Sequence, residues 1–294
     1  MLLQEHKQLI EGGQSVYTIF YNSQIVWPSV PSSIDYSEPF YVENISDTNE
    51  ILNIVKSNVS APTITVYYST DKNTWNTLGT TSTTALTYTL SPGDKLYLRA
   101  NANSWGSSGS YRNSIKGASK VGGNIMSLLY GSNFTGNETT MPTNSEYNFR
   151  YLFRDNTTLQ DASKLLLPAT VLTNRCYAGI FLNCTSLVNG LITFPLPVST
   201  AEGCYAEMFN GCTNVEVIPS LPLDVLPVRC YDRLFNNCSK VNMIICLATD
   251  ISANLCINNW TNNVAASGTF YKKAGVTWPT GVSGIPTGWT VLEV

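Results

Sequence analysis

The chain has 294 residues, of which 43% are hydrophobic and only 13% charged, and its net charge is −3. This composition excludes a disordered chain, and the length predicts two domains or one domain with small appendages. A net negative charge does not indicate the basic surface that binds nucleic acids, so we expect no nucleic-acid partner. No stretch approaches the roughly 18 apolar residues of a membrane span, so we expect no membrane insertion.

The N-terminal segment, residues 15–27, predicts two short strands around a turn at Asn22-Ser23. A hairpin of this size is too small to fold alone, so we expect it to dock on a neighbour. The alternative is that it forms the first hairpin of the next domain. The segment also resembles the small hairpin, ending in Val-Trp-Pro, that recurs in phage tail and fibre proteins. Together with a stiff Pro/Ser connector, it defines residues 1–33 as a docking hairpin and linker.

Residues 34–120 predict a β-sandwich module, of a type that often binds sugars or acts as a spacer. Six short segments rich in β-branched or aromatic residues are separated by turn residues. They are Phe40 to Ile45, Ile51 to Val55, Thr63 to Tyr68, Ala85 to Leu90, Lys95 to Ala100 and Tyr111 to Gly117.

Two features of this module suggest binding. The stretch Ser69 to Trp75 looks like the Asp-box hairpin of sialidases, but it occurs once and departs from that motif at two points. We interpret it as a hairpin turn capped by Asp71. Trp105 and Tyr111 are the candidate ligand-binding residues, since Trp105 lies in a Gly/Ser loop where its ring can face a partner or a glycan. Burial of Trp105 against the following domain is the competing interpretation, and it is the one that we favour.

An internal repeat occupies residues 148–241. Three copies share the pattern Cys-Tyr-x-x-apolar-Phe-x-x-Cys-Thr/Ser, spaced by 204 − 176 = 28 and 230 − 204 = 26 residues, and a worn copy begins at Phe149. This period, with an Asn or Cys at one fixed place, is the leucine-rich-repeat signature. The predicted repeat core is Cys176, Tyr177, Phe181, Cys184, Cys204, Tyr205, Phe209, Cys212, Cys230, Tyr231, Phe235 and Cys238.

Each copy predicts a short helix followed by a strand. The core residues fall on one arc of about 140° at helical periodicity. The residue before the second Cys is Asn183, Gly211 or Asn237, all types that accept the left-handed conformation closing a helix. Residues 187–194, 215–218 and 241–247 predict strands. The leucine-rich-repeat block is expected over residues 121–255 and a C-terminal cap with aromatic plugs over 256–294.

The eight cysteines all lie between Cys176 and Cys256. Zinc sites need closer pairs, and the only histidine, His6, is far away in sequence. Within a helix, a pair eight residues apart is separated by about 12 Å, beyond the usual Cα reach of under 7 Å. We therefore expect buried free thiols and no cofactor or metal. A disulfide between copies, within the ladder of Cys184, Cys212 and Cys238, is the remaining alternative.

The motif Cys-Tyr-x-x-Met-Phe-x-x-Cys-Thr resembles the repeat motif of the BspA-like leucine-rich-repeat proteins of gut bacteria and their phages. The resemblance extends to a lead-in at residues 123–131 and a closing segment at 268–291. This resemblance, which covers residues 121–294, implies a short leucine-rich-repeat α/β solenoid with capping segments. With the strands expected before residue 121, the expected fold is mainly β with short helices: the N-terminal hairpin, the β-sandwich module and the solenoid. The resemblance also implies that the repeats form a scaffold for interactions with other molecules and not a catalytic site.

We expect no enzyme, because no catalytic motif occurs and the scattered carboxylates fit helix starts and turns. A glycosidase built on two of those carboxylates is the weaker alternative. The expected function is a phage virion structural protein, of tail, fibre or capsid-associated type, made in the host cytoplasm. Its expected partners are other virion proteins, through the N-terminal hairpin, a second copy of the chain in a homo-oligomer, and a host-surface glycan or protein. The alternative is a bacterial cell-surface leucine-rich-repeat adhesin, which would need an export signal that residues 1–13 do not show.

Overall fold

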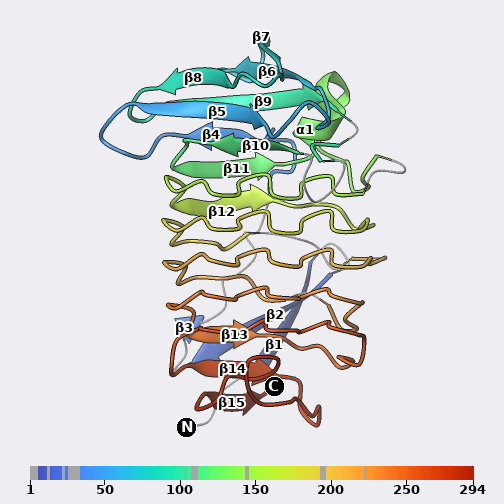
Figure 1. The fold of residues 1–294 in the computed structure, drawn as a ribbon. Coiled ribbons are helices and arrows are strands. Elements are labelled where there is room, and N and C mark those ends of the chain that lie inside the picture. The colour runs from blue at the N-terminus through green and yellow to red at the C-terminus, as the bar shows by residue number, and fades with distance from the viewer. Residues whose placement is uncertain are drawn as a thin grey trace. The chain divides into compact units, whose positions relative to one another are not determined.

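The computed structural model describes residues 34–102, 104–106, 112–142, 146–192, 197–221 and 223–294, and the backbone of three N-terminal strands (Figure 1). The chain divides into two compact units, residues 1–36 and 37–294. The described part is mainly β. Its one helical segment is α1 (Ser127–Tyr130), which continues into the 3₁₀ turn η1 (Gly131–Asn133).

The first unit contains a three-stranded antiparallel sheet in the order β1-β2-β3. Its strands are β1 (His6–Glu11), β2 (Gln14–Tyr21) and β3 (Gln24–Ile25). The predicted pair of strands is confirmed by the β2–β3 register, while Asn22 and Ser23 lie outside the described residues. The sequence did not predict β1, because its polar residues have weak strand propensity.

The second unit begins with two sheets. One has three strands in the order β10-β5-β8, and the other has six in the order β12-β11-β4-β9-β6-β7. The six predicted strands correspond to β4 (Tyr41–Glu43), β5 (Glu50–Lys56), β6 (Thr65–Ser69), β8 (Leu86–Leu90), β9 (Lys95–Asn101) and β10 (Asn113–Lys116). Three more were not predicted: β7 (Asn76–Thr80), β11 (Lys120–Asn124) and β12 (Asp161–Leu166).

The larger sheet continues across the predicted domain boundary at residue 120. Strand β11 pairs antiparallel with β4 and parallel with β12, which belongs to the worn repeat copy. Buried residues from both sheets, such as Leu52 and Val66, belong to the same hydrophobic core as the repeat residues Phe181 and Cys212. The sheets and the coils therefore share one continuous core.

The Asp-box-like stretch is a hairpin turn between β6 and β7, as predicted. The Asp71 carboxylate accepts hydrogen bonds from the backbone N–H groups of Thr74 at 2.7 Å and Asn73 at 2.8 Å. These bonds, led by the one from Thr74, lower the pKa of Asp71 to about 2. The carboxylate is thus committed to closing the turn.

The predicted repeat helices are wrong. The repeated motif forms runs of consecutive turns, drawn in Figure 1 as stacked wavy coils between the sheets. Every fourth residue of a run has a left-handed backbone, so the chain restarts a turn where a helix would continue. The left-handed triplets are Tyr147, Tyr151 and Asp155; Arg175, Gly179 and Asn183; Gly203, Glu207 and Gly211; Arg229, Arg233 and Asn237; and Leu255, Asn259 and Asn263.

Backbone N–H groups within a run alternate between two kinds of partner. The N–H of Arg150 bonds locally to the carbonyl of Tyr147 at 3.1 Å, whereas the N–H of Tyr151 bonds to Ala178, one coil further on, at 3.0 Å. The same alternation continues from coil to coil, for example from Tyr177 to Cys204 at 3.1 Å. Hydrogen bonds within the turns and hydrogen bonds between neighbouring coils together satisfy the backbone N–H groups.

Two columns of stacked aromatic rings run through the core of the coils. Phe149, Tyr177, Tyr205 and Tyr231 are spaced by 6.0, 6.1 and 6.2 Å. Phe153, Phe181, Phe209 and Phe235 are spaced by 5.5, 5.4 and 5.9 Å. Both columns end on Trp260, whose ring centroid lies 6.2 Å from that of Tyr231 and 6.4 Å from that of Phe235. At the other end, Phe40 of the first sheets stacks on Phe153 at 5.9 Å.

The run at residues 255–263 is a further copy of the repeat that the sequence reading missed. Its signal is Cys256, which follows Cys230 by 26 residues. Beyond it, Trp278 stacks on Trp260 at 5.6 Å, and Trp289 donates a hydrogen bond to Ala265 at 2.8 Å. Both rings are buried in the segment where aromatic plugs were expected.

The strands expected after each motif are mostly single bridges. The stretch 241–247 contains β13 (Met243–Ile245), which pairs in parallel with β14 (Thr269–Lys272), and β14 pairs in parallel with β15 (Thr290–Glu293). In the stretches 187–194 and 215–218, the pairing consists of isolated bridges, that of Asp161 with Asn189 and that of Asn189 with Val217. Residues 193–196 lie outside the described residues.

Gly179 tests the turn geometry. It has a left-handed backbone, and a Cβ there would lie 2.3 Å from the ring of Tyr151. We expect Gly179→Ala to lose about 1–2 kcal/mol from the backbone term and ~1–3 kcal/mol from overpacking in the free energy of unfolding. Urea unfolding measures the loss.

Gly93→Ala is the matched control. Gly93 also has a positive φ, but nothing lies within 4 Å of its added Cβ. It should therefore lose only the backbone term. Equal losses in the two variants would contradict the packing of Tyr151 across the neighbouring coil.

Candidate functional site

Trp105 is a core residue. Its side chain is 1% exposed, and its indole N–H donates a hydrogen bond to the carbonyl of Leu128 at 2.9 Å. Its backbone N–H donates to Asn148, at the start of the first coil, at 2.9 Å. This agrees with the expected burial of Trp105 against the following segment and argues against its role as a ligand-binding residue. Tyr111, the other candidate ligand-binding residue, lies outside the described residues.

The twelve residues of the predicted repeat core are all buried. All eight cysteines are free thiols. The second cysteine of each copy donates its S–H to the carbonyl of a phenylalanine in the preceding coil: Cys184 to Phe153 at 3.0 Å, Cys212 to Phe181 at 3.0 Å and Cys238 to Phe209 at 2.9 Å. These thiols thus link one coil to the next without a covalent bond.

Burial also determines the chemistry of the thiols. It raises the pKa of Cys184 and Cys212 well above the usual range, and that of Cys246 to about 12. A nucleophilic or metal-binding cysteine needs the thiolate form, which this environment disfavours. Among the described residues, no group of three or more His, Cys, Asp or Glu side chains is arranged to hold a metal ion.

The surface of the coils carries columns of hydrogen-bonded amides. Asn183 donates to Asp155 at 3.0 Å, Asn236 to Asn210 at 2.9 Å and Asn263 to Asn237 at 2.8 Å. Each bond joins equivalent positions of neighbouring coils. These amide columns share the outer surface with ion pairs, such as that of Arg233 with Glu207, and with exposed valines, such as Val198. The aromatic rings and thiols lie inside.

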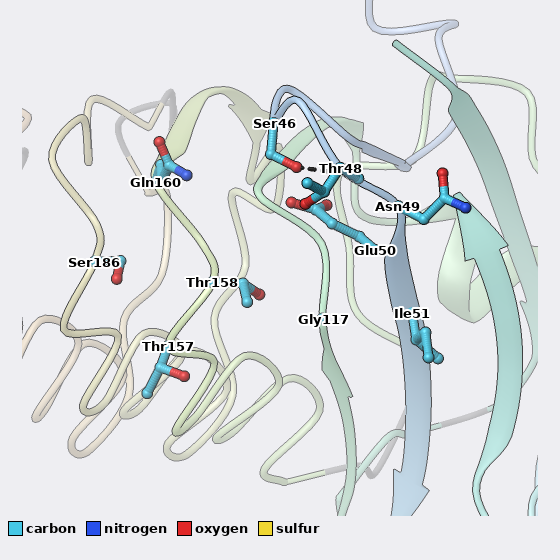
Figure 2. Close-up of a pocket in the computed structure, with 10 residues that line it drawn as sticks. All are labelled: Ser46, Thr48, Asn49, Glu50, Ile51, Gly117, Thr157, Thr158, Gln160 and Ser186. Atoms are coloured by element: carbon cyan, nitrogen blue, oxygen red, sulfur yellow. Dashed lines mark hydrogen bonds between the residues drawn. The ribbon is translucent and has the colours of Figure 1, made fainter. Parts of the chain in front are cut away.

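A shallow polar hollow lies where the sheets meet the first coils. Figure 2 shows the loop before β5 on one side and the coils on the other. Its lining residues are mostly hydroxyl and amide side chains: Ser46, Thr48, Asn49, Glu50, Ile51, Gly117, Thr157, Thr158, Gln160 and Ser186. We refer to it as the junction hollow.

Local hydrogen bonds hold several groups of the junction hollow. Ser46 donates to the carbonyl of Thr48 at 3.0 Å, and Thr158 donates to the side chain of Asn156 at 2.7 Å. Glu50 accepts a bond from the backbone N–H of Ser119 at 2.9 Å. Glu50 is the only carboxylate in this lining, so the junction hollow lacks the paired acids of a glycosidase. Its groups are suited to hydrogen bonding with a polar partner.

The sequence reading missed the junction hollow. Its signal is the hydroxyl residue that follows the motif's second Cys or Asn, as at Thr157. The other side of the hollow comes from the loop before β5, more than a hundred residues away. Spacing along the chain does not reveal that approach.

Comparisons with protein-family models, curated proteins and solved structures gave no significant match to this chain. Among the described residues, no helix has the length and hydrophobicity needed to cross a membrane.

The buried thiols predict a loss of stability in alkali. An unfolded thiol ionises above a pKa of about 8.5, whereas a buried thiol with a raised pKa stays protonated. The unfolded state then binds fewer protons than the folded state. Stability is therefore full below about pH 8.5 and falls above it by about 1.4 kcal/mol per pH unit for each such thiol. Urea unfolding at several pH values, with reductant, measures this slope.

Cys212→Ala should reduce the slope by the contribution of one thiol, about 1.4 kcal/mol per pH unit. Thr213→Ala, at the exposed neighbouring residue, is the matched control and should leave the slope unchanged. A profile that stays flat from pH 8 to pH 10 would refute the role of thiol burial.

Proposed function

We propose that the chain is a non-enzymatic structural protein of a phage virion, of tail, fibre or capsid-associated type, that makes protein contacts and attaches to the host surface. In this proposal residues 34–120 act as a β-sandwich module, and the coils act as a short leucine-rich-repeat solenoid. The observation that carries the proposal is the placement of reactive side chains. The thiols and stacked rings of the repeats are buried, while hydrogen-bonded amides and ion-paired side chains lie on the surface.

The N-terminal unit supports the docking part of this proposal. It is a separate compact unit with a three-stranded sheet, and β1 and β3 are its two edge strands. Such edges can pair with a strand of another protein. We therefore assign contact with other virion proteins, or with copies of the same chain, to residues 1–36.

Mass spectrometry of purified virions and of host envelope fractions tests the location. We expect the chain in virions at a stoichiometry above trace level. Detection only in the bacterial envelope would overturn the virion role and favour the alternative, a leucine-rich-repeat adhesin of the bacterial surface.

An adsorption assay tests the attachment role separately. Purified full-length chain should occupy receptors on the host cells and slow the adsorption of the phage. Heat-unfolded chain at the same concentration is the control. Unchanged adsorption would reject attachment while leaving the structural role in the virion intact.

A further inference from the structure

Three of the seven arginines of the chain surround one tyrosine ring in the first coil. The guanidinium carbons of Arg112, Arg150 and Arg154 lie 5.1, 4.5 and 5.1 Å from the ring centroid of Tyr151. The ring is buried, whereas all three arginines are partly exposed. We call these three residues the arginine cluster.

Contacts with the next two coils hold the central ring in place. Tyr151 lies against Gly179 of the second coil, where no side chain interferes. Its hydroxyl donates a hydrogen bond to Glu207 of the third coil at 2.9 Å and accepts one from Arg150 at 2.8 Å. The ring on which the guanidinium groups gather is thus fixed before any ligand arrives.

The positive charges of the arginine cluster are incompletely compensated. Arg154 pairs with Asp155 at 3.2 Å, but neither Arg112 nor Arg150 has an ion pair with a carboxylate among the described residues. Burial is the main cause that lowers the pKa of Arg112, and the neighbouring charge of Arg154 adds to it while Asp155 opposes it.

The arginines of the later coils provide a contrast. Arg175, Arg229 and Arg233 each pair with a glutamate, at 3.0, 3.8 and 2.7 Å respectively. An arginine in the coils is therefore ordinarily neutralised within the chain. In the first coil Arg154 follows this pattern, whereas Arg150 does not among the described residues. Like charges that lie close together raise the energy of the site unless an anion binds there.

We propose that the arginine cluster binds an oxyanion carried by an acidic glycan. The planar guanidinium group matches the oxygens of a carboxylate or phosphate in a bidentate geometry. A cluster of three cations on a chain of net charge −3 suits one anionic group rather than the repeating phosphates of a nucleic acid. The inference rests on the proposed function, because it names the ligand class for attachment to a host surface.

Calorimetric titration of the full-length chain at low salt tests the proposal. The probes are trigalacturonic acid, which carries carboxylates, and a glycerol phosphate oligomer, with maltotriose as the neutral control. We expect saturable binding of an acidic probe and none of maltotriose. Arg150→Gln should weaken that binding roughly tenfold or more, as loss of a charge-assisted hydrogen bond does.

Lys273→Gln is the matched control, since it removes one positive charge at an exposed residue far along the chain. It should leave the affinity unchanged. Circular dichroism shows whether each variant folds, and Arg112→Gln replaces Arg150→Gln if the latter does not.

The outcomes separate the sources of the oxyanion. Binding of either acidic probe that depends on Arg150 supports the proposal, and the preferred probe identifies the group as carboxylate or phosphate. No saturable binding, equal weakening by Lys273→Gln, or tighter binding of a DNA duplex would overturn it. If the chain is found in virions but binds neither acidic probe, the glycan-binding inference is refuted and the virion role stands. If it binds a probe but is found only in envelopes, the virion role is refuted and the binding inference stands.

Discussion

The hydrogen bond from one coil to the next is the interaction on which the repeat region depends. A run of turns satisfies only alternate N–H groups within itself, as at Arg150, and the others must find a carbonyl elsewhere. The neighbouring coil supplies it, as Ala178 does for Tyr151. A single coil would leave half of these donors unpaired and its rings exposed. Each coil is therefore stable only beside another, and the array needs special ends.

The ends are where the sequence motif degenerates. In the worn first copy Asn156 replaces the second cysteine, and its amide accepts a bond from Gly117 at 3.2 Å and donates one to Ala118 at 3.4 Å. These two bonds join the first coil to the segment between β10 and β11 of the sheets. At the far end one indole, Trp260, stacks on Tyr231 and on Trp278 and lies tilted against Phe235. Departures from the motif thus occur where a coil packs against the sheets at one end or against the C-terminal segment at the other.

The strands of the first module and the core residues of the repeats could be predicted from the sequence. Strands show as short segments rich in β-branched and aromatic residues, and core positions show as apolar residues repeated from copy to copy. The conformation of the motif could not. Cys176, Ile180 and Cys184 are four residues apart, a spacing that fits a helix over two turns and equally fits restarted four-residue turns. Asn183 and Gly211 indicated left-handed backbone, but Arg175 and Glu207 adopt it without any residue preference that would reveal it. Tertiary ladder bonds hold them there. The arginine cluster was missed for a similar reason, since Arg112 reaches Tyr151 only through the fold.

The restarted turn also separates the surface from the core. Core side chains occupy the positions that stack from coil to coil, such as Phe181 and Phe209. The left-handed positions between them carry side chains as different as Tyr151, Gly179, Glu207 and Arg233 in equivalent places of successive coils. The ladder bonds and the aromatic columns do not themselves use these side chains, so the residue differs from coil to coil within the limits set by its neighbours, as Tyr151 sets them at Gly179. A scaffold of this kind can acquire a local charge cluster on one coil while the others remain neutralised, which is the pattern that the arginines of the first and later coils display.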